Sequence, residues 1–172
     1  KDNIPVLFHD FRLNVDMVKD NNGNWIENRD LKIINLTYNE LQTYNIESLK
    51  PDSKYSNRFK KQQSVKGAKI SRLIDLFKLA TEEENKDVFL NLEIKSTPIE
   101  EGLTPDPQTL VSLILKDIKE YNLENRVVIT SYDWRILYEL KKQNSNVLRG
   151  FITLQQGLSK TKKNIYEDSP WM

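Results

Sequence analysis

The sequence predicts an α/β protein built around parallel strands. Short runs rich in Val, Ile and Phe alternate along most of the chain with segments in which apolar residues recur every three or four positions. This alternation, with no internal repeat or linker to mark a second domain, is typical of parallel strands joined by crossover helices. A doubly wound sheet and a (β/α)8 barrel both fit, but a complete barrel takes about 250 residues. Since the 172 residues contain four predicted strands, we expect part of a barrel or a small open sheet.

The N-terminal part is predicted to contain one strand and a long excursion. The strand is residues 4–9 (IPVLFH), and residues from about 10 to 69 should form the excursion before the next strand. An NNGN turn within it indicates a loop or hairpin. Thr37 followed by Glu40 is a capping-box pattern that starts a helix. The later part of the excursion has no apolar period, so we predict a surface connection whose RFKK run is exposed to solvent.

The C-terminal part alternates regularly between helix and strand signals. Predicted helices begin with capping residues ahead of apolar stripes, and Pro107 occupies a first helical turn, where proline is tolerated. These caps are Ser71, Asp106 and Asp133. The remaining predicted strands are residues 88–95, 127–130 and 147–153. We expect residues 1–172 to belong to a single catalytic domain.

Composition excludes several classes of function. The chain has 26 basic and 25 acidic residues, so its net charge of +1 gives no global field to gather nucleic acid. No apolar run approaches the roughly 20 residues that cross a bilayer, and the N-terminus lacks a signal-peptide pattern. The absence of cysteine excludes disulfides and thiolate chemistry but leaves the compartment open. Any anionic ligand must therefore be bound by a local group of residues.

Candidate functional residues lie where predicted strands end. In the run VFLNLEIKS, Glu93 and Lys95 share one face, because side chains two apart on a strand point the same way. His9, the single histidine, ends the first predicted strand beside Asp10. Ligands of both candidate folds bind at the C-terminal ends of strands. A carboxylate, a fixed cation and an imidazole together suit the chemistry of phosphate esters.

Simpler structural alternatives remain open for each candidate. His9 and Asp10 could be a hydrogen-bonded structural pair, and Glu93 with Lys95 could be an ion pair at a barrel rim. Ser131, at the end of the third predicted strand, could contact substrate or be a buried hydroxyl that bonds to the backbone. We take Lys95 and Ser131 as candidate substrate-binding residues.

Five segments, in order along the chain, resemble the glycerophosphodiester phosphodiesterase family. They are IPVLFHD, LTYNEL, GAKISRLIDLF, NLEIK and VVITSYDWRIL. Some features of the family are missing: its His-Arg and Glu-x-Asp pairs would precede Lys1, and its last strands would follow Met172. The resemblance thus implies a TIM (β/α)8 barrel of the phosphatidylinositol phosphodiesterase-like type, of which this chain covers about strands 3 to 6.

The resemblance also implies an activity and roles for residues. The family hydrolyses glycerophosphodiesters to sn-glycerol 3-phosphate and an alcohol with a divalent cation, here expected to be Ca²⁺ or Mg²⁺. His9 resembles a catalytic histidine that protonates the leaving alcohol, Glu93 a metal ligand, and Lys95 the catalytic cation that neutralises phosphoryl oxygens. Because one carboxylate cannot complete a Ca²⁺ or Mg²⁺ site, we expect the chain alone to be nearly inactive.

Other functions remain as alternatives. The barrel could be inactive and bind an anionic ligand or a partner protein, or it could be a related phospholipase-type phosphodiesterase. The expected partner is a small-molecule glycerophosphodiester, with no nucleic acid and no stable membrane insertion. Open sheet edges make a homo-oligomer possible. The resemblance favours an extracytoplasmic location, periplasmic or secreted, over a cytoplasmic one.

Overall fold

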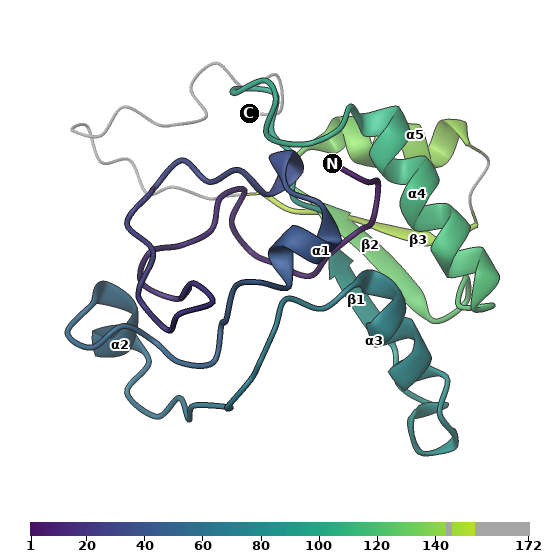
Figure 1. Cartoon of the computed structure of the whole chain (residues 1–172). Helices are drawn as coiled ribbons and strands as arrows, with labels where there is room; N and C mark the ends of the chain where they lie inside the picture. Colours follow the sequence, from purple (N-terminus) through teal and green to yellow (C-terminus); the bar gives the residue numbers. More distant parts are fainter. Residues whose placement is uncertain (144–145, 154–172) are drawn as a thin grey trace. The chain divides into compact units, whose positions relative to one another are not determined.

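The computed structural model describes residues 1–143 and 146–153. The chain falls into two compact units, Lys1–Glu82 and Glu83–Met172. Figure 1 labels the main helices and strands of both units. No helix in the described ranges is long and apolar enough to span a membrane.

The first unit contains little regular structure. Its helices are short and follow one 3₁₀ turn, in the order η1 (Ile33–Asn35), α1 (Tyr38–Leu41), α2 (Lys54–Arg58) and α3 (Leu73–Ala80). The capping box predicted at Thr37 is confirmed, since the Thr37 hydroxyl accepts from the Glu40 N–H and the Glu40 carboxylate accepts from the Thr37 N–H. The cap predicted at Ser71 is wrong by one residue. Arg72 takes that place, and its N–H donates to Asp75 Oδ2 at 3.0 Å.

The strand predicted at residues 4–9 is not present. Its contact with another segment is an isolated antiparallel bridge between Val6 and Arg72, and the Leu7 N–H donates to the Ser71 carbonyl at 2.9 Å. The chain is irregular at His9, where it bends. The local composition was favourable for a strand, but a strand also needs a paired neighbour along its length.

The first part of the excursion predicted at about residues 10–69 helps to build a core, and the surface connection was predicted only for its later part. Buried apolar side chains pack together in and next to this segment, one of them from α1 and the others from irregular segments: Leu13, Val15, Val18, Ile26, Leu41 and Ile70. Backbone hydrogen bonds link the segments, as where Lys19 and Asn45 exchange N–H to carbonyl bonds of 2.9 Å. This core gives the first unit its own stability.

The second unit is a parallel α/β structure, as predicted. Its elements, in order, are η2 (Glu83–Asn85), β1 (Leu90–Glu93), α4 (Pro107–Glu120), β2 (Val127–Ser131), α5 (Trp134–Lys142) and β3 (Leu148–Phe151). The strands form a parallel sheet in the order β1-β2-β3, while α4 packs on α5 and α5 contacts β2 and β3 (Figure 1). The caps predicted at Asp106 and Asp133 are confirmed, and Pro107 stands in the first turn of α4. β1 and β3 lie within their predicted ranges, and β2 ends one residue after its predicted range.

Candidate active-site residues

The C-terminal end of β1 carries an ion pair. Glu93 is the last residue of the strand, and Lys95 Nζ donates to Glu93 Oε1 at 2.5 Å. Their side chains are 34% and 26% exposed, so both can still meet a ligand from solvent. The ammonium also lies 5.9 Å from the centroid of the Tyr132 ring. Lys95 is therefore held between a carboxylate and an aromatic face, in a position where an anion could bind.

A row of three residues crosses the sheet at this level. The register places Glu93 beside Thr130, and Thr130 beside Gly150 of β3. The Thr130 hydroxyl donates to Asn91 Oδ1 at 3.0 Å. A Cβ atom on Gly150 would lie only 2.7 Å from Thr130 Cγ2, well inside van der Waals contact. Because Gly150 has no side chain, the Thr130 side chain has space next to Glu93.

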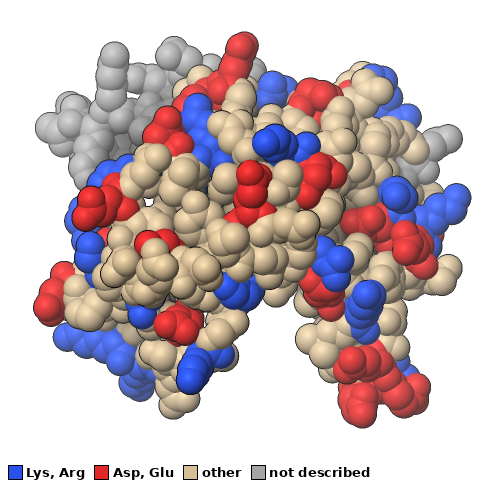
Figure 2. Space-filling model, viewed as in Figure 1, with Lys and Arg blue, Asp and Glu red and all other residues tan. Residues whose placement is uncertain are grey.

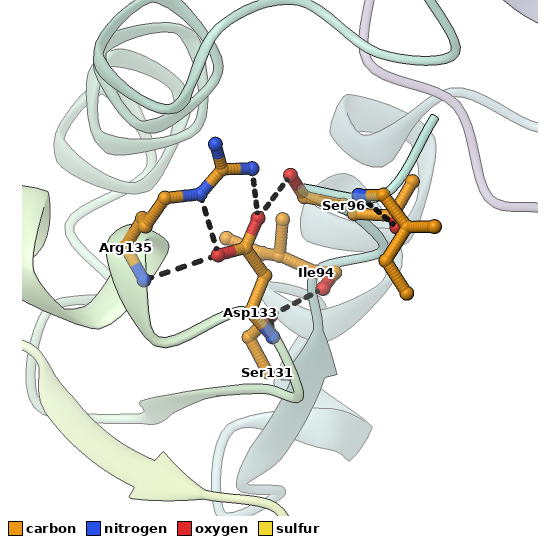
Figure 3. Close-up of polar contacts among 7 residues, drawn as sticks. Ile94, Ser96, Ser131, Asp133 and Arg135 are labelled. Carbon is orange, nitrogen blue, oxygen red and sulfur yellow. Dashed lines mark hydrogen bonds and ion pairs between the residues drawn. The ribbon is translucent and has the colours of Figure 1, made fainter. Parts of the chain in front are cut away.

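Behind the ion pair lies a buried hydrogen-bond network that joins the ends of β1 and β2 (Figure 3). Ser131 is fully buried, and its hydroxyl donates to the Ile94 carbonyl at 2.8 Å and accepts from the Asp133 N–H at 3.0 Å. The Ser131 hydroxyl is therefore used within the protein. Of the two alternatives for Ser131, this geometry favours the structural hydroxyl over the substrate contact.

Asp133 is the centre of this network, and 1% of it is exposed. Its Oδ2 accepts from the Ser96 hydroxyl at 2.7 Å and from Arg135 Nη2 at 2.7 Å. Its Oδ1 accepts from Arg135 Nε at 2.9 Å, so the guanidinium binds the carboxylate with two parallel bonds. Figure 3 shows the carboxylate between the Arg135 fork and Ser96.

Burial and hydrogen bonding act against each other on the Asp133 carboxyl. Burial raises its pKa, but the bonds from Arg135 and Ser96 together outweigh this effect and hold the pKa below the ordinary value. The bonds between Arg135 and the Asp133 carboxylate in turn raise the pKa of Arg135. Both groups thus stay charged at neutral pH, as a stable ion pair requires.

The network fixes the backbone on both sides of Lys95. Ile94, the residue before it, is bound through its carbonyl by Ser131, and Ser96, the residue after it, is bound through its hydroxyl by Asp133. The Ile94 N–H also donates to the Thr130 carbonyl at 2.8 Å, which extends the pairing beyond the strand. A flexible lysine side chain therefore starts from a well-anchored Cα.

His9, in the first unit, is solvent-exposed and oriented by Asp10. Its Nδ1 lies 2.7 Å from Asp10 Oδ1, and the histidine side chain is 76% exposed. Asp10 Oδ2 in turn accepts from Asn14 Nδ2 at 2.8 Å. A carboxylate only accepts, so Nδ1 carries the proton of this bond and Nε2 is the nitrogen left for exchange with another molecule.

The described residues contribute little to a metal site by themselves. Within residues 1–143 and 146–153, no group of three or more His, Asp or Glu side chains is placed to hold a cation. Glu93 can offer its second carboxylate oxygen, Oε2, since Oε1 binds Lys95. One oxygen does not satisfy Ca²⁺ or Mg²⁺, which take six or more ligands. Glu93 is therefore at most one member of a larger ligand set.

A parallel sheet with charged side chains at the carboxyl end of a strand defines an α/β protein of the kind that binds ligands at that edge. The family model described as the glycerophosphoryl diester phosphodiesterase family matches residues 1–166. The chain belongs to the glycerophosphoryl diester phosphodiesterase family. Membership implies a TIM-barrel-like α/β fold, and the family generally uses divalent cations.

Two relatives illustrate the match. A curated glycerophosphodiester phosphodiesterase of Caldanaerobacter subterraneus is 36% identical over 86 residues, which are 50% of this chain and 32% of the relative. A crystal structure assigned to a glycerophosphoryl diester phosphodiesterase of Silicibacter pomeroyi matches with a TM-score of 0.81 and 26% identity, over 94% of this chain and 55% of that one. The chain thus spans about a third of the curated relative and about half of the solved structure.

Sequence reasoning placed Glu93 and Lys95 on one face of a strand end but missed the network behind them. Asp133 was predicted only as a helix cap, and it does accept from the Arg135 N–H at 3.1 Å. Its further bonds to the Arg135 side chain and to Ser96 were not foreseen. The Asp-x-Arg spacing in the sequence could have indicated the bond to Arg135. Nothing in the sequence indicated the bond to Ser96, which lies 37 residues away.

Proposed function

We propose that the protein hydrolyses glycerophosphodiesters to sn-glycerol 3-phosphate and an alcohol as a metal-dependent phosphodiesterase. The observation that carries the proposal is the Glu93–Lys95 pair at the C-terminal end of β1, in a chain that matches the family over residues 1–166. The scaffold we propose is a TIM barrel to which this chain contributes about strands 3 to 6. The proposal concerns the protein with its natural ends.

In this mechanism the chain's own residues bind the anion and supply one proton. Lys95 Nζ binds a phosphoryl oxygen and stabilises the charge that grows on it as water attacks phosphorus and releases a proton to solvent. As the phosphorus–oxygen bond to the alcohol breaks, His9 Nε2 gives its proton to the departing oxygen. Asp10 keeps the ring oriented for this transfer. Such general acid catalysis commonly contributes about 10²–10⁴-fold.

Glu93 is the proposed metal ligand, through the oxygen that does not bind Lys95. A bound divalent cation, Ca²⁺ or Mg²⁺, supplies Lewis-acid polarisation of the phosphoryl group and lowers the pKa of coordinated water.

Release of sn-glycerol 3-phosphate from glycerophosphocholine tests the proposal, measured with added Ca²⁺ or Mg²⁺ and again with a chelator. We expect chelator-sensitive release that falls by at least about 100-fold in His9→Ala and in Glu93→Gln. Glu120→Gln, an exposed carboxylate change on α4, is the matched control and should keep full activity. Normal turnover in either site variant would refute the residue roles.

A second candidate function is a barrel that binds an anionic ligand or a partner protein without catalysis. The observation in its favour is that the Lys95 ammonium is partly exposed and keeps donor hydrogens beyond the one that it gives to Glu93, so it can bind an anion without a metal. A folded protein that binds glycerophosphocholine but releases no product with metal supplied would establish it. Cleavage of intact phosphatidylinositol or sphingomyelin instead would assign a phospholipase-type activity. An extracytoplasmic location is part of our proposal, and cell fractionation tests it.

A further inference from the structure

Basic charge in this chain is concentrated in one segment, residues 50–69, which we call the basic loop. It contains seven basic residues and one acidic residue, Asp52, and so carries a net charge of +6. The whole chain carries only +1, which leaves −5 for everything else. The basic residues are Lys50, Lys54, Arg58, Lys60, Lys61, Lys66 and Lys69. The near-neutral total therefore hides a strongly positive segment.

Hydrogen bonds join the segment just before the basic loop, residues 46–47, to the C-terminal part of the loop, residues 65–68. The Val65 N–H donates to the Glu47 carbonyl at 2.9 Å, and the Gly67 N–H donates to Glu47 Oε2 at 3.2 Å. The Ile46 N–H donates to the Ala68 carbonyl at 3.0 Å. Between these points the chain runs outward and forms α2, which Ser53 caps by accepting from the Ser56 N–H. The loop is thus presented on a closed base.

The basic loop combines charge with exposed apolar side chains, Phe59 in its outer part and Val65 at its base. None of its basic side chains forms an ion pair with another described residue. Phe59 is 43% exposed and Val65 64% exposed. Figure 2 shows basic side chains gathered at the lower left of the view, where Figure 1 draws α2. Cations and apolar side chains that share one protruding loop need a partner that is both anionic and apolar.

We propose that the basic loop binds the surface of an anionic phospholipid bilayer. The lysines and arginine would be attracted to the headgroups, while Phe59 and Val65 would enter the boundary between headgroups and acyl chains. Nucleic acid fits less well, because it rewards aromatic rings that are open for base stacking. The Phe59 ring is already covered by Tyr55, 6.1 Å away between centroids, and by the Arg58 guanidinium at 5.1 Å.

Co-sedimentation of the full chain with vesicles tests this proposal without reference to catalysis. We expect binding to vesicles of equal parts phosphatidylglycerol and phosphatidylcholine, much weaker binding to phosphatidylcholine alone, and loss of binding as salt is raised. A triple variant, Arg58→Gln, Lys60→Gln and Lys61→Gln, should bind roughly 100-fold more weakly, at about fivefold for each cation near the surface. These side chains are exposed, so the fold should be retained and circular dichroism can check it.

A matched control removes the same charge elsewhere. Lys116→Gln, Lys119→Gln and Lys141→Gln change exposed lysines of α4 and α5 and should leave vesicle binding within about twofold of wild type. Phe59→Ser should weaken binding even at low salt, because its contribution is apolar. Equal losses in the two triple variants would overturn the proposal, since net charge rather than the loop would then be responsible. Binding to single-stranded RNA without binding to anionic vesicles would also overturn it, in favour of a nucleic-acid surface.

Discussion

Replacing Asp133 by Asn should loosen the end of the sheet that supports Lys95. The substitution keeps the size of the side chain but removes the charge that binds the Arg135 fork. It also puts an amide donor where one oxygen accepts from Ser96 or from Arg135. The segment from Ile94 to Ser96 would lose the bond from Ser96 to the Asp133 carboxylate and keep the bond from Ser131 to the Ile94 carbonyl.

The size of the expected free-energy loss follows from how far the Asp133 and Arg135 side chains are buried. Breaking a fully buried ion pair by removing one partner costs about 3–5 kcal/mol. The Asp133 side chain is fully buried, but that of Arg135 is 40% exposed, so water can still solvate the guanidinium left behind. We therefore expect a loss at or below the lower end of this range, about 2–3 kcal/mol in the free energy of opening.

Hydrogen exchange at the amides of β1 and β2 measures this free energy within the second unit. A loss of about 2–3 kcal/mol corresponds to exchange that is roughly 30- to 150-fold faster. Asp106→Asn is the matched control, because it makes the same chemical change at the exposed cap of α4. If both variants exchange at the same rate, the Asp133 network does not hold the strand ends together.

The same network predicts a dependence on acid. The pKa of Asp133 is lowered in the folded state, so its contribution to stability is complete above the ordinary carboxyl pKa and is lost as the pH falls through the lowered value. Wild-type protection should fall over that acid range. Asp133→Asn should lack this part of the pH dependence, and an identical acid profile in the two proteins would contradict the ion-pair assignment.

Further variants test other parts of the structure. Gly150→Ala should destabilise the sheet by about 1–3 kcal/mol through the contact with Thr130, and adding Thr130→Ser should restore much of the loss in urea unfolding. Asp117→Asn on α4 should stabilise the protein by about 1 kcal/mol at neutral pH, because Oδ2 is buried without a partner among the described residues. Burial raises the pKa of Asp117, so the gain should disappear as the pH falls below the ordinary carboxyl range, and a gain independent of pH would contradict this cause. Thr37→Ala should cost about 1 kcal/mol in thermal unfolding of the first unit through loss of the capping box, and no cost would show that the cap is dispensable.

The second unit was predictable because its signals are local and periodic. Apolar alternation marked β1, Asp106 with Pro107 marked the start of α4, and Asp133 marked the start of α5. Each of these features depends on residues within one turn or one strand. The single-domain prediction for residues 1–172 stays a prediction, as do the roles of His9, Glu93 and Lys95.

The first unit was harder to predict because its core has no period. Leu13, Val18 and Ile26 are buried, yet they come from irregular segments in which neither strand nor helix spacing applies. The strand predicted at residues 4–9 failed for a related reason, since its composition was right but only one bridge pairs it. Pairing and irregular packing depend on distant residues, and a single sequence does not display them.

The closed base of the basic loop would let evolution change two properties independently, the surface that the loop binds and the chemistry at β1. Bonds between residues 46–47 and residues 65–68 complete the ring, so the chain inside it can lengthen, shorten or change composition with little effect on the core beneath. Doubling the length of a closed loop costs only about 0.6 kcal/mol. Homologues with the same residues around β1 could therefore carry very different loops at this position. Their cellular locations could then differ while the reaction that they catalyse stays the same.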